Sequence, residues 1–353
     1  HLSIRRQRQM CIRDRKIAIY GAGSLGTIMG AFLSESNPDV DLIDVNEAHV
    51  NELNNNGAHI VGKVDYSQNV KALTPSQIND KYDIVLLLTK QVFNKDVLPT
   101  VKEILKDDGV LVSLQNGVPE EFIQQTIPKE QIVAGSVEFG ATFEGPGKSK
   151  LTTEFESFKE NAIQIGELNG EITERIQNIQ KALSPIGGIS ISENLPGTKW
   201  AKLIINSAFS GMSAATGGTY GDVVDSDTGA KAALYAINEV INVGKSAGIE
   251  FVSLSVLDYK YFEEITNVEK QIDEMREMIK HSRLLEASML QDLQKQRPTE
   301  IDYINGIVTK LGKENNVNTP VNDLIVEIVS DAQNQKTVPD FNESIEKFKS
   351  VVE

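Results

Sequence analysis

A short apolar segment runs directly into three closely spaced glycines near the start of the chain, and this arrangement limits the folds open to it. Residues 16–30 read KIAIYGAGSLGTIMG, so a predicted strand is followed by Gly21, Gly23 and Gly26 and then by a helical segment. A GxGxxG spacing alone is a weak signal. A strand before it and a helix after it are typical of a dinucleotide-binding βαβ unit, which predicts a parallel α/β sheet.

Each glycine of this loop has a distinct expected role. Gly21 permits the tight turn, Gly23 lets a pyrophosphate approach the backbone, and Gly26 allows close packing of the helix on the strand. The phosphates would lie at the positive end of the helix. A glycine-rich turn without a ligand is the alternative. We predict a cofactor-binding loop made of Gly21, Gly23, Ser24, Leu25 and Gly26.

The second predicted strand, DVDLID, ends with Asp44, at the distance from the loop where a dinucleotide fold contacts the adenosine ribose. A carboxylate accepts hydrogen bonds from the 2′ and 3′ hydroxyls and repels a 2′-phosphate. Asp44 therefore favours NADH over NADPH. The alternative is that Asp44 only caps a helix predicted to begin near Asn46.

Two more predicted strands end in polar side chains. YDIVLLLTKQ ends with Thr89 and Lys90, and GVLVSLQNGV ends with Gln115 and Asn116. Both are nearly continuous apolar runs, as expected for strands covered on both faces. Ligands bind at the carboxyl ends of open parallel sheets, so these positions favour function over simple turn formation.

Short strands are predicted across residues 131–192, with a hairpin at FEGPGK (residues 143–148) and an amphipathic helix over residues 171–183. After Pro196 helical periodicity takes over. We therefore predict a Rossmann-like dinucleotide-binding domain over residues 16–193 and an all-helical domain over residues 194–353 for substrate binding and dimerisation.

Several helices are expected in the second half. One runs from Asn194 to Ser210, one covers AKAALYAINEVINVGKSAG, a charged and solvated one spans residues 259–280, and one covers RLLEASMLQDLQKQ. In the segment TEIDYING, Glu300 falls in the first turn of a further helix, where a carboxylate is favourable. Helix capping is therefore an alternative to a functional role for Glu300.

The bulk composition excludes several classes of protein. A formal net charge of −15 over 353 residues is unfavourable for binding nucleic acid or an anionic membrane. The only cysteine is Cys11, and His49, His59 and His281 are far apart, so we expect no metal site. Without an apolar run of about 18 residues we expect a soluble, cytoplasmic protein.

Residues 1–15, HLSIRRQRQMCIRDR, differ from the rest of the chain. They are rich in arginine, do not begin with Met, and contain QMCIRDR, which looks like a translated sequencing adapter. We interpret this segment as a non-native or disordered leader before a true start near Lys16.

The predicted helix that ends at Ser210 is apolar nearly all round, yet Lys202, Asn206 and Ser210 share one face at i, i+4 and i+8. Burying an unpaired ammonium is costly, so this face must meet something polar. A cleft that holds a dinucleotide and a polar substrate is the candidate.

Together, GAGSLG, LTK, LQNG, KWAKLIIN and SMLQD followed by TEIDYING resemble the ketopantoate reductase family, the 2-dehydropantoate 2-reductases. The resemblance runs from Lys16 to about Gly312. It implies a Rossmann domain and a helical domain that enclose a cleft, where NADPH or NADH reduces a small 2-oxo acid. By default the substrate is 2-dehydropantoate, and the product (R)-pantoate enters pantothenate and coenzyme A biosynthesis. The resemblance also implies a possible homodimer.

The resemblance assigns roles residue by residue. Lys202 matches the catalytic lysine and general acid, with Glu300 as its carboxylate partner. Ser288 matches the serine that binds the substrate carboxylate. The two asparagines of the family's cleft match Asn116 and Asn206. The family's lysine beside the cofactor matches Lys90. The resemblance assigns Asn116 to both catalysis and cofactor binding.

Three positions depart from the family pattern. Ser210 stands where a second asparagine is common, Tyr220 lies near the expected place of another, and Asp44 replaces a basic residue that favours NADPH. Asp44 in LID and the later EGPGK resemble the corresponding segments of an NADH-dependent branch of this superfamily. That branch comprises D-2-hydroxyacid dehydrogenases that reduce branched or aromatic 2-oxo acids. Both substrate classes stay open. A non-catalytic dinucleotide sensor and an opine-type enzyme are minor alternatives.

Overall fold

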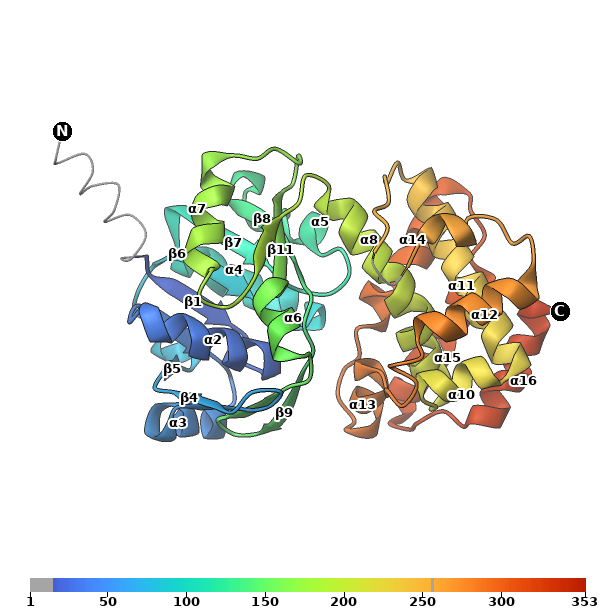
Figure 1. The fold of residues 1–353 in the computed structure, drawn as a ribbon, viewed down its shortest axis with the longest axis horizontal. Coiled ribbons are helices and arrows are strands. Elements are labelled where there is room, and N and C mark those ends of the chain that lie inside the picture. The colour runs from blue at the N-terminus through green and yellow to red at the C-terminus, as the bar shows by residue number, and fades with distance from the viewer. Residues whose placement is uncertain (1–14, 255–256) are drawn as a thin grey trace. The chain divides into compact units, whose positions relative to one another are not determined.

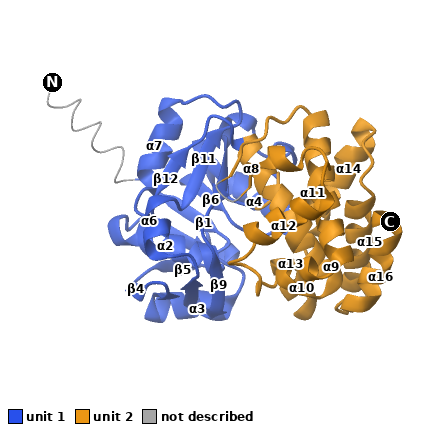
Figure 2. Cartoon of the chain, turned by 45° about the vertical axis from the view of Figure 1, so that its right-hand side comes forward, with its two compact units in different colours: residues 1–115, 119–195 blue, residues 116–118, 196–353 orange. Residues whose placement is uncertain are grey.

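Figure 1 shows the computed structural model, which describes residues 15–254 and 257–353. Residues 1–14 of the expected leader lie outside the described part of the chain. The chain divides into two compact units, coloured blue and orange in Figure 2. Unit 1 comprises His1–Gln115 and Pro119–Leu195, and unit 2 comprises Asn116–Val118 and Pro196–Glu353.

Unit 1 is built on an eight-stranded sheet with the order β12-β11-β8-β7-β6-β1-β2-β5. Its strands are β1 (Ile17–Tyr20), β2 (Val40–Ile43), β5 (Lys71–Leu73), β6 (Tyr82–Leu87), β7 (Leu105–Ser113), β8 (Ile132–Val137), β11 (Ile163–Glu167) and β12 (Ile189–Ile191). Neighbours from β5 to β8 are parallel, and β11 pairs antiparallel with β8. The chain builds outward in opposite directions from β1 and β6, which makes the point between them the topological switch.

The sheet is covered on both faces, as the apolar strand sequences predict. Ile17 and Ile19 of β1 belong to one core cluster and Ala18 and Tyr20 to another, because successive side chains of a strand point to opposite faces. The first core includes side chains of α2 (Ser24–Ser36) and α7 (Glu174–Leu183), and the second includes side chains of α4 (Asn94–Ile104) and α5 (Glu120–Ile123). Two further helices are α3 (Glu47–Asn56) and α6 (Phe155–Glu160).

A second, four-stranded sheet has the order β4-β3-β10-β9. Its strands are β3 (Ala58–Gly62), β4 (Tyr66–Gln68), β9 (Ala141–Gly145) and β10 (Lys148–Leu151). β9 and β10 form the hairpin predicted at FEGPGK, which is confirmed. β10 also pairs with β3, a contact between distant segments that the sequence pattern did not indicate.

Unit 2 is helical, and with unit 1 this confirms the predicted fold class. Its elements are α8 (Leu195–Ile205), the π-helical segment η4 (Asn206–Gly211), α9 (Met212–Thr216), α10 (Tyr220–Asp225), α11 (Asp227–Ser246), η5 (Tyr259–Phe262), α12 (Val268–Met278), α13 (Ser288–Gln294), η6 (Ile301–Tyr303), α14 (Asn305–Asn315), α15 (Pro320–Gln335) and α16 (Phe341–Val352). The long α11 is the centre, contacted by α10, α12, α14, α15 and α16.

The core of unit 2 gathers side chains from most of these helices. Phe209 is fully buried there. Burial of a side chain of this size stabilises the fold by about 1.5–3 kcal/mol. Within the described ranges, none of the helices is long and apolar enough to cross a bilayer.

Two predicted helices begin later in the chain than expected. The helix expected over residues 171–183 begins only at Glu174, because the Thr173 side chain accepts a hydrogen bond from the backbone N–H of Ile176 and caps it there. The helix expected over RLLEASMLQDLQKQ begins only at Ser288.

The charged stretch of residues 259–280 is not one solvated helix. It is a short 3-10 turn, η5, followed by α12, whose start is capped by Asn267. The buried Gln271 donates to the backbone carbonyls of Tyr261 and Glu264 at 2.8 and 2.9 Å, and so ties the intervening loop to α12.

Candidate functional site: a glycine loop in unit 1 and a polar pocket in unit 2

The glycine loop between β1 and α2 has a backbone that side chains would disrupt. Gly21 has φ +103°, a conformation that L residues rarely adopt, and a Cβ there would lie 2.7 Å from the backbone nitrogen of Thr89. A Cβ on Gly26 would lie 2.4 Å from the carbonyl oxygen of Gly21. Both glycines are therefore required by the protein's own packing.

Gly23 differs, because a Cβ at this position would meet nothing within 4 Å. Gly23 is the N-cap of α2, and it supplies no side-chain cap, nor does an acidic residue occupy the first turn. The first-turn amides of Ser24, Leu25 and Gly26 are the groups that a helix N-terminus offers to an anion. These features fit the pyrophosphate of a dinucleotide.

The loop is also fixed by a histidine that sequence reasoning set aside. The carbonyl oxygen of Ala22 accepts hydrogen bonds from Thr27 Oγ1 at 2.8 Å and from His49 Nε2 at 2.7 Å. His49 Nδ1 accepts from the backbone N–H of Gly147 at 2.9 Å, so the network assigns the proton to Nε2. The buried His49 thus joins the glycine loop to the β9–β10 hairpin.

Asp44 follows β2 directly, and its Oδ1 accepts a hydrogen bond from the backbone N–H of Asn46 at 2.9 Å. The cap of α3 is Asn46 itself, whose side chain accepts from the backbone N–H of His49. The helix-capping alternative for Asp44 was therefore wrong. Its second carboxylate oxygen, Oδ2, takes no part in this turn.

At the end of β7, Gln115 has a structural role. Its Nε2 donates to the carbonyl oxygen of Thr89 at 2.6 Å and to Asn94 Oδ1 at 2.7 Å, and Asn94 Nδ2 donates back to Gln115 Oε1 at 3.0 Å. Gln115 therefore holds the segment that carries Lys90 after β6. Lys90 itself is partly buried and precedes a 3-10 turn.

In unit 2, side chains from distant positions of the chain converge on one pocket. Asn116, Asn206, Ser210, Ser288 and Glu300 line it, with two apolar side chains that the sequence did not suggest, Met289 and Ile304. The pocket measures about 30 Å³. Since a water-sized group needs about 10–15 Å³, it accommodates one polar group of a substrate.

Ser288 and Glu300 are positioned by contacts from other helices. The backbone N–H of Tyr220 donates to the carbonyl oxygen of Leu285 at 3.1 Å, which holds the segment before Ser288 against α10. Gln333 Oε1 accepts from both the backbone N–H and the hydroxyl of Thr299, at 2.7 and 2.9 Å. Glu300, only 8% exposed, is the N-cap residue of η6, but its side chain makes no capping hydrogen bond there.

Lys202 is half-buried on α8, one turn before Asn206. The helix predicted to run unbroken to Ser210 changes its winding at Asn206, where the π-helical η4 begins. Ser210 Oγ lies 2.7 Å from the hydroxyl of Tyr220, so the two departures from the family pattern contact each other. Burial raises the pKa of Tyr220, and the hydrogen bond with Ser210 opposes that shift.

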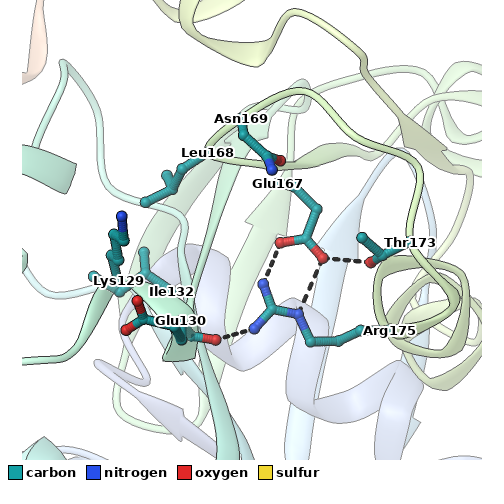
Figure 3. A pocket seen from close by; sticks show the side chains of 8 residues that line it. All are labelled: Lys129, Glu130, Ile132, Glu167, Leu168, Asn169, Thr173 and Arg175. Atoms are coloured by element: carbon teal, nitrogen blue, oxygen red, sulfur yellow. Dashed lines mark hydrogen bonds and ion pairs between the residues drawn. The ribbon is translucent and has the colours of Figure 1, made fainter.

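A larger cavity of about 380 Å³ lies in unit 1, lined among others by Glu167 and Arg175 (Figure 3). It sits where β8 begins and β11 ends, at the edge of the sheet away from the glycine loop. Arg175 Nε donates to Glu167 Oε1 at 3.0 Å, and Thr173 donates to the same oxygen. The charged groups of this cavity are therefore already paired with each other. We place the candidate site at the smaller pocket, which is lined by the asparagine, serine and glutamate side chains described above.

The Rossmann sheet with its glycine loop and the helical unit with its polar pocket define a dinucleotide-dependent oxidoreductase. Comparison with known families agrees. Residues 17–170 match the family model "Ketopantoate reductase PanE/ApbA", and residues 194–333 match the model of its C-terminal part. The chain belongs to the ketopantoate reductase family and is an NAD(P)-dependent oxidoreductase.

Individual relatives show the same likeness. The 2-dehydropantoate 2-reductase of Pyrococcus horikoshii is 30% identical over 316 residues, which cover 89% of this chain and 96% of the relative. That of Streptococcus pyogenes serotype M3 is 28% identical with the same coverage. A D-mandelate dehydrogenase solved with NADH and anilino(oxo)acetate superposes with a TM-score of 0.77 at 26% identity, over 91% of this chain and 99% of the other.

Proposed function

We propose that the protein reduces a small 2-oxo acid to the 2-hydroxy acid, with unit 1 binding the dinucleotide and unit 2 binding the acid. The observation that carries this proposal is the pocket where Asn116, Asn206, Ser288 and Glu300 converge. Lys202 is not among its lining residues, but it is half-buried on α8, one helical turn before Asn206. The leading substrate is 2-dehydropantoate, because the curated relatives at 28–30% identity bear that name.

Lys202 is the general acid of the proposed reaction. A bound nicotinamide supplies hydride to C2 of the substrate, and the electron pair of the carbonyl bond moves onto oxygen. The Lys202 ammonium stabilises this alkoxide and donates its proton to it, after which the neutral amine takes a proton from water. Glu300 orients Lys202 and accepts a hydrogen bond from a substrate hydroxyl.

The neutral donors of the pocket are suited to the substrate carboxylate. The amides of Asn116 and Asn206 and the hydroxyl of Ser288 all line it. They donate hydrogen bonds without neutralising the charge, so they orient the acid. Ser210 lies beside them and contacts the part of the substrate that distinguishes one 2-oxo acid from another.

Asp44 supports NADH as the preferred cofactor. One oxygen of its carboxylate is used in the turn to Asn46, and the other would accept a hydrogen bond from a ribose hydroxyl. A negative charge at this strand end repels the 2′-phosphate of NADPH.

The second candidate is an NADH-dependent D-2-hydroxyacid dehydrogenase that acts on branched or aromatic 2-oxo acids. Asp44 favours it, as does the likeness to the D-mandelate dehydrogenase solved with NADH. Ser210 and Tyr220, in place of the family's asparagines, also favour a different substrate group at this end of the pocket.

A substrate and cofactor panel separates the two candidates. The initial rate is measured with 2-dehydropantoate, 2-oxoisocaproate and phenylpyruvate, each with NADH and with NADPH. The highest kcat/KM on 2-dehydropantoate supports pantoate formation, and a higher value on the other acids supports the dehydrogenase. A strong preference for NADPH contradicts the role of Asp44, and no turnover of any acid contradicts the proposed function.

Replacing the general acid should have the largest effect on turnover. Lys202→Ala is expected to lower kcat by at least about 100-fold, because general acid catalysis contributes on the order of 10²–10⁴. Cofactor affinity, measured by NADH fluorescence, should stay near the wild-type value. Lys310→Ala is the control, since Lys310 is an exposed lysine of α14 in the same unit. An unchanged kcat in Lys202→Ala would overturn the assignment.

A homodimer is also part of the proposal, from the resemblance to the family. Size-exclusion chromatography with light scattering tests it. A monomer at micromolar concentration would contradict it.

A further inference from the structure

The helix that carries Lys202 and Asn206 changes its winding where it reaches the pocket. α8 ends at Ile205, residues Asn206–Gly211 form a π-helical turn, and α9 resumes α-helical winding. π-helical turns are rare and occur mostly as single turns inside α-helices, often at functional sites. Asn206 and Ser210 belong to this turn and both line the pocket. The structure must therefore hold a winding that the flanking helices do not favour.

A buried side chain from another helix contacts the turn. Asn305, at the start of α14, is fully buried, and its Nδ2 donates to the carbonyl oxygen of Ser207 at 3.1 Å. Ser207 is the second residue of the π turn, and its carbonyl would serve the helix's own hydrogen bonds in a regular α-helix. Insertion of a side chain into this ladder is a known cause of local change in helix winding.

The space for this contact exists because residue 211 is a glycine. A Cβ on Gly211 would lie 2.7 Å from both Nδ2 and Oδ1 of Asn305. The amide therefore occupies the volume that any other side chain at position 211 would need. Gly211 has ordinary helical dihedral angles, so the close approach, and not an unusual backbone, requires the glycine.

Asn305 is itself held by two buried residues. Its Nδ2 also donates to Asn322 Oδ1 at 2.9 Å, and Asn322 Nδ2 donates to Glu239 Oε2 at 2.7 Å. Asn305 and Asn322 are fully buried, and Glu239 is 7% exposed. These buried hydrogen bonds orient the amide nitrogens of Asn305 and Asn322, while Asn305 Oδ1 is buried without a hydrogen-bond partner in the described part of the chain.

The far end of the network is anchored at a helix terminus. Glu239 of α11 accepts from the backbone N–H groups of Val321 and Asn322, each at 2.9 Å, and so caps α15. Burial raises the pKa of Glu239 to about 7, against these N–H donors, which favour the ionised form. α11, α15 and α14 are thereby joined to the turn.

We infer that Asn305, oriented by Asn322 and Glu239, is a positioning residue that holds the π turn of residues 206–211 and so places Asn206 and Ser210 in the pocket. This inference rests on the proposed function of that pocket. It assigns to three residues outside the pocket lining a share of the affinity and selectivity for the 2-oxo acid.

The first test compares two asparagines of unit 2. Asn305→Ala is expected to raise KM for the 2-oxo acid by on the order of 10-fold to 100-fold, because small misplacements of positioning groups have effects of this size. KM for NADH should change little. Asn238→Ala is the matched control, since Asn238 Nδ2 also makes two hydrogen bonds, to the backbone carbonyls of Phe262 and Glu263 and not to the turn. Equal KM values in the two variants would overturn the inference.

The second test uses Gly211. Gly211→Ala should raise KM for the 2-oxo acid, because the new methyl group displaces the Asn305 amide. In the double variant Gly211→Ala with Asn305→Ala, the amide is absent and the methyl group has space. The combined effect should therefore be smaller than the product of the two single effects, and strict multiplication would contradict the proposed contact.

Hydrogen exchange provides a readout that does not depend on turnover. Amides of residues 206–216 should exchange faster in Asn305→Ala than in Asn238→Ala. If the wild-type protein reduces none of the 2-oxo acids, the proposed function fails, while the exchange comparison still decides whether Asn305 holds the turn. Equal exchange in both variants overturns the inference even if the enzyme is active.

Discussion

The glycine loop of unit 1 and the π turn of unit 2 are both irregular backbone segments at candidate binding sites, but they are held in different ways. Within the loop, Gly21 and Gly26 approach each other five positions apart and Thr27 bonds the carbonyl of Ala22. The backbone N–H groups of Gly21 and Ala22 also donate to Ile43 at the end of the neighbouring strand β2. The π turn depends on Asn305, which is 98 positions from its partner Ser207.

This difference explains why the glycine loop was recognised as a sequence motif and the π turn was not. A loop whose conformation depends on its own glycines requires the same residue types at the same spacing wherever it occurs. A turn held by a distant side chain leaves no local pattern apart from an unremarkable glycine. The loop is expected to respond to changes within it, and the turn to changes far from it in sequence.

The sharpest test within the loop contrasts two of its glycines. Gly23→Ala should leave the melting temperature unchanged, because the added methyl group meets no protein atom within 4 Å. The methyl group would, however, occupy the place where we expect the pyrophosphate to approach the backbone. We expect NADH affinity to fall by about 100-fold, or about 3 kcal/mol, in a fluorescence titration.

Gly26→Ala is the companion variant. Its methyl group would lie 2.4 Å from the carbonyl oxygen of Gly21, so both melting temperature and NADH affinity should fall. Normal affinity in Gly23→Ala would show that the loop does not bind the pyrophosphate.

A smaller effect is expected at the contact between Ser210 and Tyr220. Ser210→Ala should change the ratio of kcat/KM between 2-dehydropantoate and 2-oxoisocaproate by about 10-fold, because a lost hydrogen-bonding group alters discrimination between polar and apolar substrates. Tyr220→Phe removes the partner of Ser210 and should shift the ratio less. Unchanged ratios in both variants would remove Ser210 from substrate selection.

The smallest effect concerns the contact between the glycine loop and His49. His49→Phe keeps an aromatic ring but loses the hydrogen bonds to Ala22 and Gly147, each worth about 0.5–1.5 kcal/mol. KM for NADH should rise about threefold to tenfold. His59→Phe is the control, because the His59 ring is exposed and its described hydrogen bond is with Ser67, away from the glycine loop. Equal KM values would mean that the His49 hydrogen bonds do not help to hold the loop.

The strands of the Rossmann sheet were the most predictable elements. Ile17–Tyr20 and Tyr82–Leu87 are buried on both faces, and such strands show as continuous apolar runs. The second sheet was harder to predict from the sequence, because β3 pairs with a strand that begins almost ninety residues later. The charged segment of residues 259–280 was misjudged because Gln271, a polar residue, is buried through its hydrogen bonds to backbone carbonyls.

The same distinction between local sequence patterns and long-range contacts applies to the candidate site. Lys202, Asn206, Ser288 and Glu300 could be named because family motifs preserve their neighbours in sequence. The contacts that position them came from elsewhere: Gln333 beside Glu300, Tyr220 beside Ser210, and Asn305 behind the turn. Each is a polar side chain whose partner is a distant atom, which periodicity and spacing do not reveal.

By itself, the sequence determined the βαβ unit, its glycine loop, the acidic strand end at Asp44 and the helical character of the second half, because these follow from local conformation and apolar periodicity. Only the tertiary structure decided that the helix after Lys202 winds into a π turn and that Asn206 and Ser210 meet Ser288 and Glu300. Such features depend on buried hydrogen bonds between residues far apart in the chain, and these form only when the helices pack.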